Sequence, residues 1–546
     1  MLRHKDIEPR IIGLIIAGIF FVFMGIPMAA MLWQCFWDGS GLSLEHFKTV
    51  FTETNFGVAL VNSLWISGVA ALLTTGIASI MAYALHYSRL PEWVKRGVRT
   101  ITVLPMLLPT ITYGFAIMYS FGKQGMLTPF IGGGEAGIYG IKGLLLGYVI
   151  YTLPISFLLI NNTLGYIDKR YSVVSRVMGD SKVRTLWVTV ARPMTGTLAI
   201  SFIQCFFLAF TDYGIPASLA GRFDTVAITL YNQMLGSVPD FGNGAVVALI
   251  MLLPSLISIV IINTLERYNM SYSGLSQVTV PKNPLRDIFL GAFAVVVDLA
   301  LLSIFAVILI IPALKAWPYD CTLTLKHYQA VLADSALTKI YLNSLWVAVC
   351  SAVIGVAISF GAAVVTERSA VSKGLKNFIR GVATMANTLP GMVLGIAFML
   401  SFKGSILQNT FAVVILSNMV HFFATPYMMA KNALSKMDHS WESTARLMGD
   451  SWFATLRRVI IPNARATIVE VFQYYFINAM VTISAVVFLT GARTMVLTTK
   501  IKELQHYGSF YEVFVLSLLI LGTNLLVKGI TFALIKYQKK RQGVLQ

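Results

Sequence analysis

The chain has 546 residues, of which 56% are hydrophobic and 12% are charged, and its mean hydropathy is +0.73. A soluble globular domain carries about 25% charged residues, so this composition excludes an ordinary soluble enzyme and indicates a polytopic membrane protein. The net charge of +18 does not indicate a nucleic-acid-binding protein, because the basic residues lie in short loops between apolar runs, as membrane orientation requires.

A membrane-spanning helix needs about 20 apolar residues, and twelve runs of this kind occur in the chain. The first, from Ile11 to about Phe36, is too long for the apolar core of a signal peptide and lacks a small-residue cleavage site. In chain order the predicted spans are 11–36, 57–86, 99–121, 141–163, 195–218, 244–265, 287–313, 338–365, 379–402, 409–433, 464–490 and 511–536. We therefore expect an all-α polytopic membrane protein with about 12 transmembrane helices.

Basic residues in short loops predict the orientation of these spans. They gather after the second span, after the eighth span and in the tail, which we expect to be cytoplasmic: Arg89, Lys95, Arg96, Arg99, Arg368, Lys373, Lys376, Arg380, Lys536, Lys539, Lys540 and Arg541. Both termini are then cytoplasmic, and the protein is expected to be a multi-pass protein of the bacterial inner membrane. Segment 491–510 is an exception, because it is assigned to the outside and yet is rich in Lys and Arg.

The sequence is internally duplicated. "LSLEHFKTVF" at 42–51 matches "LTLKHYQAVL" at 323–332, and "NSLW" at 62–65 recurs at 343–346, in both cases 281 positions later. The offset falls to 270 further along, so the second copy lacks about eleven residues, which we assign to the Gly-rich outer loop 122–140. Six spans per copy give both copies one orientation, as in a parallel repeat about an axis along the membrane normal. The predicted domains are a first repeat at 1–268, a polar cytoplasmic linker at 269–286 and a second repeat at 287–546.

A charged stretch recurs after the fourth span of each repeat. It reads "RVMGDSKVRTLWVTVARP" at 176–193 and "RLMGDSWFATLRRVIIP" at 446–462. The Gly suits a left-handed C-terminal position of a short helix, the following Asp and Ser are good N-cap types, and the Pro fits the first turn of the next helix. We expect a helix, a Gly break and a second helix along the cytoplasmic face. This surface could lie on lipid headgroups or in a groove of a soluble partner, and two copies favour a dimeric partner.

The stretch resembles the EAA loop of binding-protein-dependent ABC importer permeases, with the approximate pattern E-A-A-x3-G-x9-I-x-L-P. The second copy keeps Glu442, Ala445, Gly449, Ile461 and Pro462, with the acid one position early. The first copy has Ser172 in place of Glu442, and its Pro193 lies one residue too far from Gly179. The resemblance implies two fused permease domains of the type I importer architecture and alternating access driven by a separate ATPase. The residues it assigns to ATPase coupling are Arg176, Met178, Gly179, Asp180 and Ser181 in the first copy, and Glu442, Ala445, Arg446, Met448, Gly449, Asp450 and Ser451 in the second.

Partners and cofactors follow from the same resemblance. No G-x-x-x-x-G-K-[ST] phosphate loop occurs in the chain, so we expect no enzyme activity and no cofactor here, with ATP and Mg²⁺ bound by a homodimeric ATPase. An extracellular or periplasmic binding protein would deliver the substrate. We expect no catalytic or metal site: the four cysteines show no metal-type spacing, and the repeat pair His46 and His327 lies in amphipathic segments that we interpret as interfacial helices.

The substrate and the class each have alternatives. Segments 210–236 and 240–255 are most similar to permeases for 2-aminoethylphosphonate uptake, with ferric iron next and then thiamine or polyamines. An ion-coupled secondary transporter can also have six plus six parallel repeats. It would not explain the duplicated loop, and the G-x-x-x-D-R pattern after the second span is missing. A sensor or scaffold related to these permeases is a third reading.

Polar residues within predicted spans are candidates for a translocation path, because a central charge costs about 2.5–3.5 kcal/mol on insertion scales. The candidates are Gln204, Asp212, Glu470, Gln473 and Asn478, and Gln204 and Gln473 occupy matching positions in the two repeats. The alternative is hydrogen bonding between packed helices, at about 0.6 kcal/mol each. The recurring prolines Pro109, Pro390, Pro154 and Pro426 predict kinks that shape the bundle.

Overall fold

The computed structural model describes residues 7–52, 55–131, 137–266 and 283–541. Within these ranges the regular secondary structure is helical apart from one antiparallel pair of strands, β1 (Leu314–Ala316) and β2 (Asp320–Leu323), which confirms the predicted all-α class. Two compact units form: one comprises residues 1–48, 233–252 and 328–546, and the other residues 49–232 and 253–327. Most of the predicted linker 269–286 lies outside the described residues.

The helices of the first repeat start with a span that passes through a π-helical turn. They are α1 (Ile7–Phe20), η1 (Phe21–Gly25), α2 (Ile26–Phe36), α3 (Glu45–Thr52), α4 (Phe56–Tyr87), α5 (Glu92–Ile101), η2 (Leu104–Leu107), α6 (Thr110–Phe121), α7 (Thr128–Ile131), α8 (Ile141–Tyr166), α9 (Arg170–Val177), α10 (Lys182–Leu186), η3 (Trp187–Ala191), α11 (Arg192–Thr211), α12 (Gly214–Leu219), α13 (Val226–Leu235) and α14 (Phe241–Glu266).

The second repeat follows the same order, with the strand pair after its first span. Its helices are α15 (Pro284–Ile310), η4 (Ile311–Ala313), α16 (Lys326–Ala333), α17 (Ser335–Glu367), α18 (Lys373–Ala386), α19 (Gly391–Phe402), α20 (Phe411–His421), α21 (Ala424–Ser435), α22 (Ser440–Leu447), α23 (Trp452–Thr455), η5 (Leu456–Ile460), α24 (Ile461–Asn463), α25 (Arg465–Val481), η6 (Val486–Phe488), α26 (Leu497–His506) and α27 (Phe510–Arg541).

Eight helices among the described residues are long and apolar enough to cross a membrane, and up to eleven if each bent helix pair is one span. The eleventh predicted span, 464–490, is too long, because α25 has 17 residues and ends at Val481. Span 195–218 was wrong in the same way, since α11 ends at Thr211. In both repeats the next residue, Asp212 or Thr482, has an extended backbone with ψ near 135°, so the helix cannot continue.

Prolines mark the bends in the third span of each repeat. The axis turns by 109° between α5–η2 and α6, and by 111° between α18 and α19. Pro109 and Pro390 stand at these breaks as the residues before α6 and α19, where a missing backbone N–H costs nothing. The other proline pair behaves differently: α20 and α21 are bent by 53°, whereas the equivalent α8 is one helix that contains Pro154.

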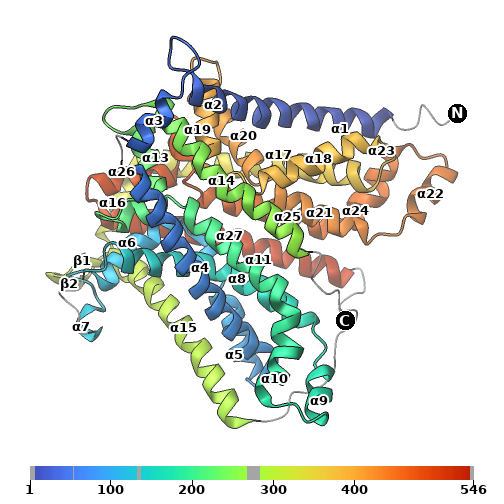
Figure 1. Cartoon of the computed structure of the whole chain (residues 1–546), viewed down its shortest axis with the longest axis horizontal. Coiled ribbons are helices and arrows are strands. Elements are labelled where there is room, and N and C mark those ends of the chain that lie inside the picture. The colour runs from blue at the N-terminus through green and yellow to red at the C-terminus, as the bar shows by residue number, and fades with distance from the viewer. Residues whose placement is uncertain (1–6, 53–54, 132–136, 267–282, 542–546) are drawn as a thin grey trace. The chain divides into compact units, whose positions relative to one another are not determined.

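The first span of each repeat packs in the unit built mainly from the other repeat. α1 contacts α17 and α18, and α2 contacts α19; Figure 1 shows α1 running beside α17 and α18. α15 contacts α4, α5 and α6 of the first repeat. A Cβ on Gly13 would lie 2.7 Å from a Leu375 methyl, and one on Gly291 would lie 2.6 Å from a Leu90 methyl. Small residues therefore allow close packing in both places, of α1 on α18 at Gly13 and of α15 on the chain between α4 and α5 at Gly291.

The recurring "NSLW" motif fastens a short helix that follows the fifth span. Ser63 Oγ accepts the backbone N–H of Val226 at 2.9 Å, and Ser344 Oγ accepts that of Leu497 at 2.7 Å. These two N–H groups are the first of α13 and α26, which are otherwise unsatisfied at a helix start. Asn62 and Asn343 donate to the backbone carbonyls of Asp224 and Met495, at 3.1 and 3.2 Å. The motif recurs because each repeat needs the same tertiary cap.

The chain between the first and second spans is also built alike in the two repeats. His46 Nε2 lies 3.2 Å from the Trp37 carbonyl, and His327 Nε2 lies 3.3 Å from the Lys315 carbonyl. Each histidine thus ties the amphipathic helix α3 or α16 to the preceding turn. Lys315 also pairs with Asp320 at 2.8 Å across the β1–β2 hairpin. The hydrogen bond from Lys315 lowers the pKa of Asp320 to about 2.

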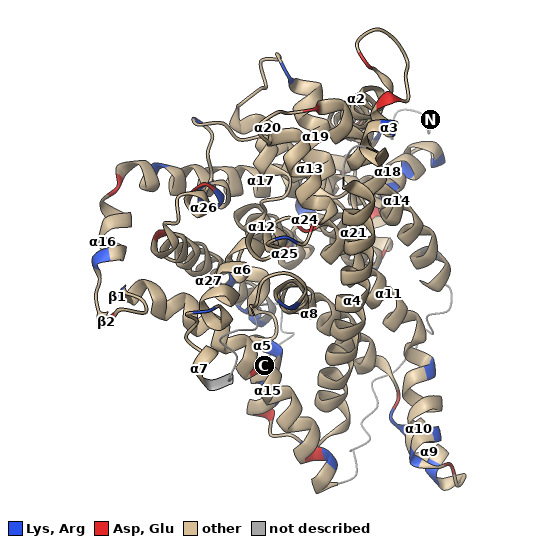
Figure 2. Cartoon of the chain, turned by 60° about the vertical axis from the view of Figure 1, so that its left-hand side comes forward, with Lys and Arg blue, Asp and Glu red and all other residues tan. Residues whose placement is uncertain are grey.

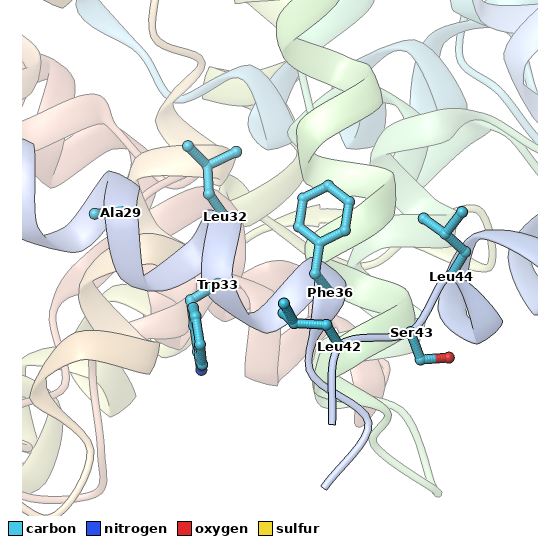
Figure 3. A pocket seen from close by; sticks show the side chains of 7 residues that line it. All are labelled: Ala29, Leu32, Trp33, Phe36, Leu42, Ser43 and Leu44. Carbon is cyan, nitrogen blue, oxygen red and sulfur yellow. The ribbon is translucent and has the colours of Figure 1, made fainter. Parts of the chain in front are cut away.

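An apolar hollow of about 640 Å³ lies on α2 and the chain that follows it (Figure 3). Its walls are Ala29, Leu32, Trp33, Phe36, Leu42, Ser43 and Leu44. Trp33 stacks on Trp37, with ring centroids 5.5 Å apart. Aromatic side chains at the end of a span are typical of the level of the lipid headgroups.

Candidate functional site

The duplicated charged stretches form two loops of the same design. EAA-like loop 1 (residues 168–193) contains α9, Gly179, α10 and η3, and EAA-like loop 2 (residues 438–462) contains α22, Gly449, α23 and η5. The predicted helix, Gly break and second helix are therefore present in both copies. EAA-like loop 1 leads directly into α11, and EAA-like loop 2 leads through the short α24 into α25.

The Gly break has the backbone that the sequence predicts. Gly179 has φ +86° and Gly449 has φ +85°, the left-handed conformation that L-residues with a Cβ adopt only with strain. The N–H of Asp180 reaches back to the Ser175 carbonyl at 3.1 Å, and that of Asp450 to the Ala445 carbonyl at 3.0 Å. This six-residue closure is the Schellman motif that ends helices at glycine.

Of the two residues that follow each Gly, the serine caps the next helix and the aspartate forms an ion pair. Ser181 Oγ accepts the N–H of Arg184, and Ser451 Oγ accepts that of Ala454, so serine is the N-cap in both loops. The aspartates instead form ion pairs, Asp180 with Arg184 at 3.0 Å and Asp450 with Arg458 at 2.7 Å. Since these pairs are largely exposed, each contributes at most about 1 kcal/mol.

The extra residue of EAA-like loop 1 lies in the short helix after the Gly. α10 has five residues and α23 has four, and each is followed by a five-residue π-helical turn, η3 or η5. A π-helical turn accommodates an irregular number of residues inside a helix. Pro193 and Pro462 therefore both stand in the first turn of the helix after η3 or η5.

Apolar side chains project from both loops at the Gly break. Val177 and Met178 are 82% and 78% exposed, and the equivalent Leu447 and Met448 are 89% and 80% exposed. Exposed apolar residues at matching places in two repeats are typical of a protein or membrane interaction surface. On the buried side of each loop, Ala445 is buried in loop 2, and the equivalent Ser175 donates to Asp180 at 2.7 Å in loop 1.

Charge surrounds the apolar tips. Basic residues gather on α9 and α10 (Figure 2), namely Arg170, Arg176, Lys182 and Arg184. Burial lowers the pKa of Lys169, which precedes α9. In loop 2 the backbone N–H of Ser440 holds the pKa of Asp438 below its usual range. Arg446 lies within α22.

Two charged residues outside the loops contact loop 2, and sequence reasoning did not assign them to it. Arg368, read only as an orientation signal, lies 3.2 Å from Glu442. Glu8, near the start of α1, accepts a hydrogen bond from the backbone of Phe453. The repeat register offered a signal for Arg368, because it stands where the first repeat has Tyr87. No sequence signal pointed to Glu8.

The path candidates lie on the fifth spans, and several already have local partners. Asp212 is buried and accepts the N–H of Ile215 at 2.8 Å, which caps α12. Gln473 accepts the hydroxyl hydrogen bond of Thr531, and Asn478 donates to the Tyr474 carbonyl at 2.8 Å within its own helix. Gln204 is half-buried on α11, and Glu470 is exposed on α25. Their role in a path stays a prediction.

The fold and the loops together define the class of protein. The chain is a multi-pass helical membrane protein with two repeats of the same design, and each repeat has a Gly-broken loop before its fifth span. These features are those of an ABC importer permease. The chain belongs to the family described as binding-protein-dependent transport system inner membrane component, whose model matches residues 74–268 and 355–536. It is accordingly an inner-membrane protein, as predicted.

Individual relatives are distant but cover most of the chain. The ferric transport system permease protein FbpB of Actinobacillus pleuropneumoniae is 23% identical over 531 residues, which is 93% of this chain and 76% of the relative. A Haemophilus influenzae protein that bears a ferric transport permease name is 25% identical over 500 residues, 87% of this chain and 77% of the relative. The thiamine transport system permease protein ThiP of Escherichia coli is 22% identical over 438 residues, 77% of each.

Proposed function

We propose that the two EAA-like loops bind the two subunits of a separate homodimeric ATPase, and that ATP-driven closure of that dimer moves the two repeats through alternating access. The observation that carries this proposal is the pair of exposed apolar tips, Val177 with Met178 and Leu447 with Met448, each at a left-handed glycine. Exposed apolar side chains of this kind are typical of a protein interaction site. Both loops, and both termini, then lie on the cytoplasmic side.

We propose ferric iron, delivered by a periplasmic binding protein, as the substrate. Support comes from two relatives with ferric transport names, each of which aligns with more than four-fifths of this chain. The sequence-based preference for 2-aminoethylphosphonate has no such support and becomes the second candidate, with thiamine after it. For a ferric substrate Glu470, which is exposed on α25, is the path candidate of most interest, because hard cations prefer oxygen ligands. The Asp212 carboxylate already caps α12.

The ATPase proposal is tested by purification from native membranes. The tagged full-length chain should bring down an ATPase in a two-to-one ratio, together with a binding protein. A double substitution at the tips, Met178→Asp with Met448→Asp, should lose the ATPase while the permease remains folded. Matched substitutions of exposed apolar residues elsewhere, Leu285→Asp and Ile406→Asp, should keep it. Retention of the ATPase by the tip variant would overturn the proposed contact.

The substrate proposal is tested on the co-purified binding protein and on the assembled transporter. Binding of ferric iron, 2-aminoethylphosphonate and thiamine is measured by calorimetry, and ATP-dependent uptake of each is measured in proteoliposomes. We expect ferric iron to bind and to be transported. Transport of either organic compound with no ferric uptake would replace iron as the substrate while leaving the ATPase proposal intact.

A further inference from the structure

A buried group of charged residues ties EAA-like loop 2 to the end of α17. Arg368 directly follows α17, and its Nη1 lies 3.2 Å from Glu442 Oε1 and 2.8 Å from His439 Nδ1. The side chains of Arg368 and Glu442 are only 1% and 11% exposed. We call Arg368, His439 and Glu442 the Arg368 cluster.

The chemistry of the Arg368 cluster makes it a fixed attachment. Arginine only donates hydrogen bonds and stays charged, so His439 Nδ1 and the Glu442 carboxyl oxygens are its acceptors. A buried guanidinium without its carboxylate is strongly unfavourable, so α22 cannot leave the end of α17 at low cost. Since Leu447 ends the helix that begins two residues before Glu442, fixing Glu442 also fixes the direction of the exposed tip.

The adjacent residue extends the attachment to neighbouring helices. Glu367 lies 3.3 Å from Arg380 of α18 and 4.0 Å from Lys431 of α21. The end of α17 is therefore joined to α18 and α21 through Glu367 and to α22 through Arg368. A displacement of loop 2 would be passed to these membrane helices through ion pairs.

The first repeat has the same positions with different chemistry. In the repeat register Tyr87 replaces Arg368, Lys169 replaces His439 and Ser172 replaces Glu442. The Lys169 ammonium lies 5.9 Å from the centre of the Tyr87 ring, a cation–π contact near the outer limit of its range. His86 stands in place of Glu367, and Asn161 stands in place of Lys431. A hydrogen bond of 3.0 Å between His86 Nε2 and Asn161 Oδ1 therefore takes the place of that ion pair. At the positions that match the Arg368 cluster, EAA-like loop 1 therefore has a cation–π contact where EAA-like loop 2 has a buried ion pair.

We propose that Arg368 is a positioning residue that holds EAA-like loop 2 rigidly to α17. The ATPase would then move the second repeat through the rigid Arg368 cluster, and the first repeat through the weaker contact of Lys169 with Tyr87. This inference rests on the proposed ATPase contact. It assigns Glu442 an intrachain partner and makes the two loops mechanically unequal.

The test uses the assembled transporter, with permease, ATPase and binding protein reconstituted in proteoliposomes. Arg368→Ala and Glu442→Ala should each lower the uptake per ATP hydrolysed by about tenfold or more, because each leaves a buried charge unpaired. The double variant should be no worse than either single variant, because both changes remove the same interaction. The charge exchange Arg368→Glu with Glu442→Arg should recover part of the loss.

Matched variants separate positioning from general destabilisation. Arg368→Lys keeps a charge that reaches Glu442 and should retain more uptake than Arg368→Ala. Lys169→Ala and Ser172→Ala, at the matching positions of loop 1, should change uptake far less. Hydrogen exchange provides a readout apart from transport: Arg368→Ala should speed exchange of amides 440–447 in loop 2 and leave amides 170–177 of loop 1 unchanged.

The outcomes are distinguishable. If the wild-type chain recruits no ATPase, the proposed function fails, and this inference fails with it. If the wild type is coupled but Arg368→Ala and Glu442→Gln keep full uptake and unchanged exchange at 440–447, the Arg368 cluster has no positioning role. Equal losses from Lys169→Ala and Arg368→Ala would refute the inequality of the two loops. Should Arg368→Ala fail to fold, Glu442→Gln carries the same test.

Discussion

Glu8 and Phe453 are joined by a hydrogen bond although 445 positions separate them: Glu8 Oε2 accepts the backbone N–H of Phe453 at 3.1 Å. Phe453 is the second residue of α23, whose first N–H groups have no partner within the helix. A carboxylate at a helix N-terminus also interacts favourably with the helix dipole. The first span of the chain thus helps to cap EAA-like loop 2.

Removal of this acceptor should loosen α23. We expect Glu8→Ala to speed hydrogen exchange at 452–456 by about two- to fivefold, since an exposed charge at a helix end contributes about 0.3–1 kcal/mol. Glu8→Gln, which keeps an acceptor oxygen, should have a smaller effect. Glu45→Ala removes an exposed acid from α3 and serves as the control; equal effects of the two alanine variants would contradict a specific contact.

The serines of the "NSLW" motif should stabilise their repeats. Ser344→Ala leaves the first N–H of α26 buried without its acceptor, and we expect a loss of about 1–3 kcal/mol in unfolding free energy. Ser63→Ala should behave in the same way at α13. Thermal unfolding in detergent measures both. Ser303, whose hydroxyl bonds within α15 on an exposed face, is the control, and a Ser303→Ala loss as large as that of Ser344→Ala would remove the special role of the motif.

Gly449 should tolerate conformation-matched residues and reject bulky ones. Nothing lies within 4 Å of a Cβ placed there, so the obstacle in the free protein is the positive φ, which costs about 1–2 kcal/mol for most residues. We expect Gly449→Asn to couple normally and Gly449→Trp to fold but lose ATPase binding and uptake. Gly508 has φ +72° and equal space, so Gly508→Trp should keep the ATPase. Normal binding by Gly449→Trp would place the docking surface elsewhere.

The close contact between Gly391, at the start of α19, and Ser484 predicts that a substitution of one residue can be compensated by a substitution of the other. A Cβ on Gly391 would lie 2.7 Å from Ser484 Oγ, and its other close neighbours are also side-chain atoms. Gly391→Ala should therefore destabilise by about 1–3 kcal/mol, and Ser484→Gly should relieve it. In the first repeat a Cβ on Gly214 meets the Ile111 backbone nitrogen at 2.5 Å as well as Thr110.

Thr110→Gly should consequently fail to rescue Gly214→Ala, because the backbone obstruction remains. Unfolding midpoints of the four single and two double variants provide the measurement. Equal rescue in both repeats would mean that the Ile111 backbone moves to make room for the added Cβ, which would contradict the expected difference between the repeats.

Substitutions of Asp212 distinguish a structural role of this residue from a role in transport. Its carboxylate caps α12 through Ile215, and asparagine caps about as well as aspartate. We expect Asp212→Asn to fold normally and retain uptake, and Asp212→Ala to lose about 1 kcal/mol of stability. Loss of uptake by a stable Asp212→Asn protein would instead assign its negative charge to the translocation path.

Local chemistry explains what the sequence predicted well. Gly179, Gly449, Ser181 and Ser451 adopt the expected conformations because a helix end at glycine and a serine N-cap depend on a few neighbouring residues. Pro109 and Pro390 mark real breaks for the same reason. The ends of the fifth spans were mispredicted, because hydropathy continues past Thr211 and Val481 whereas the backbone turns there.

Long-range contacts account for what remained beyond prediction. The repetition of Asn62 and Ser63 as Asn343 and Ser344 was evident, but their partners lie more than 150 positions away and share no motif with them. Arg368 looked like any basic residue near a membrane until the fold placed Glu442 beside it. A single sequence carries no covariation that would report such pairs.

The exchanged positions of α1 and α15 constrain how the polypeptide matures in the cell. α1 enters the bilayer well before α17, α18 and α19 have been synthesised, so its packing face, including Gly13 and Phe20, must be shielded by lipid or by the insertion machinery meanwhile. Severing the chain in the linker would give two fragments, each carrying a helix that belongs with the other. Co-expression of the fragments, and not either one alone, should then yield a stable product, so that the gene fusion guarantees that the two halves meet in equal number.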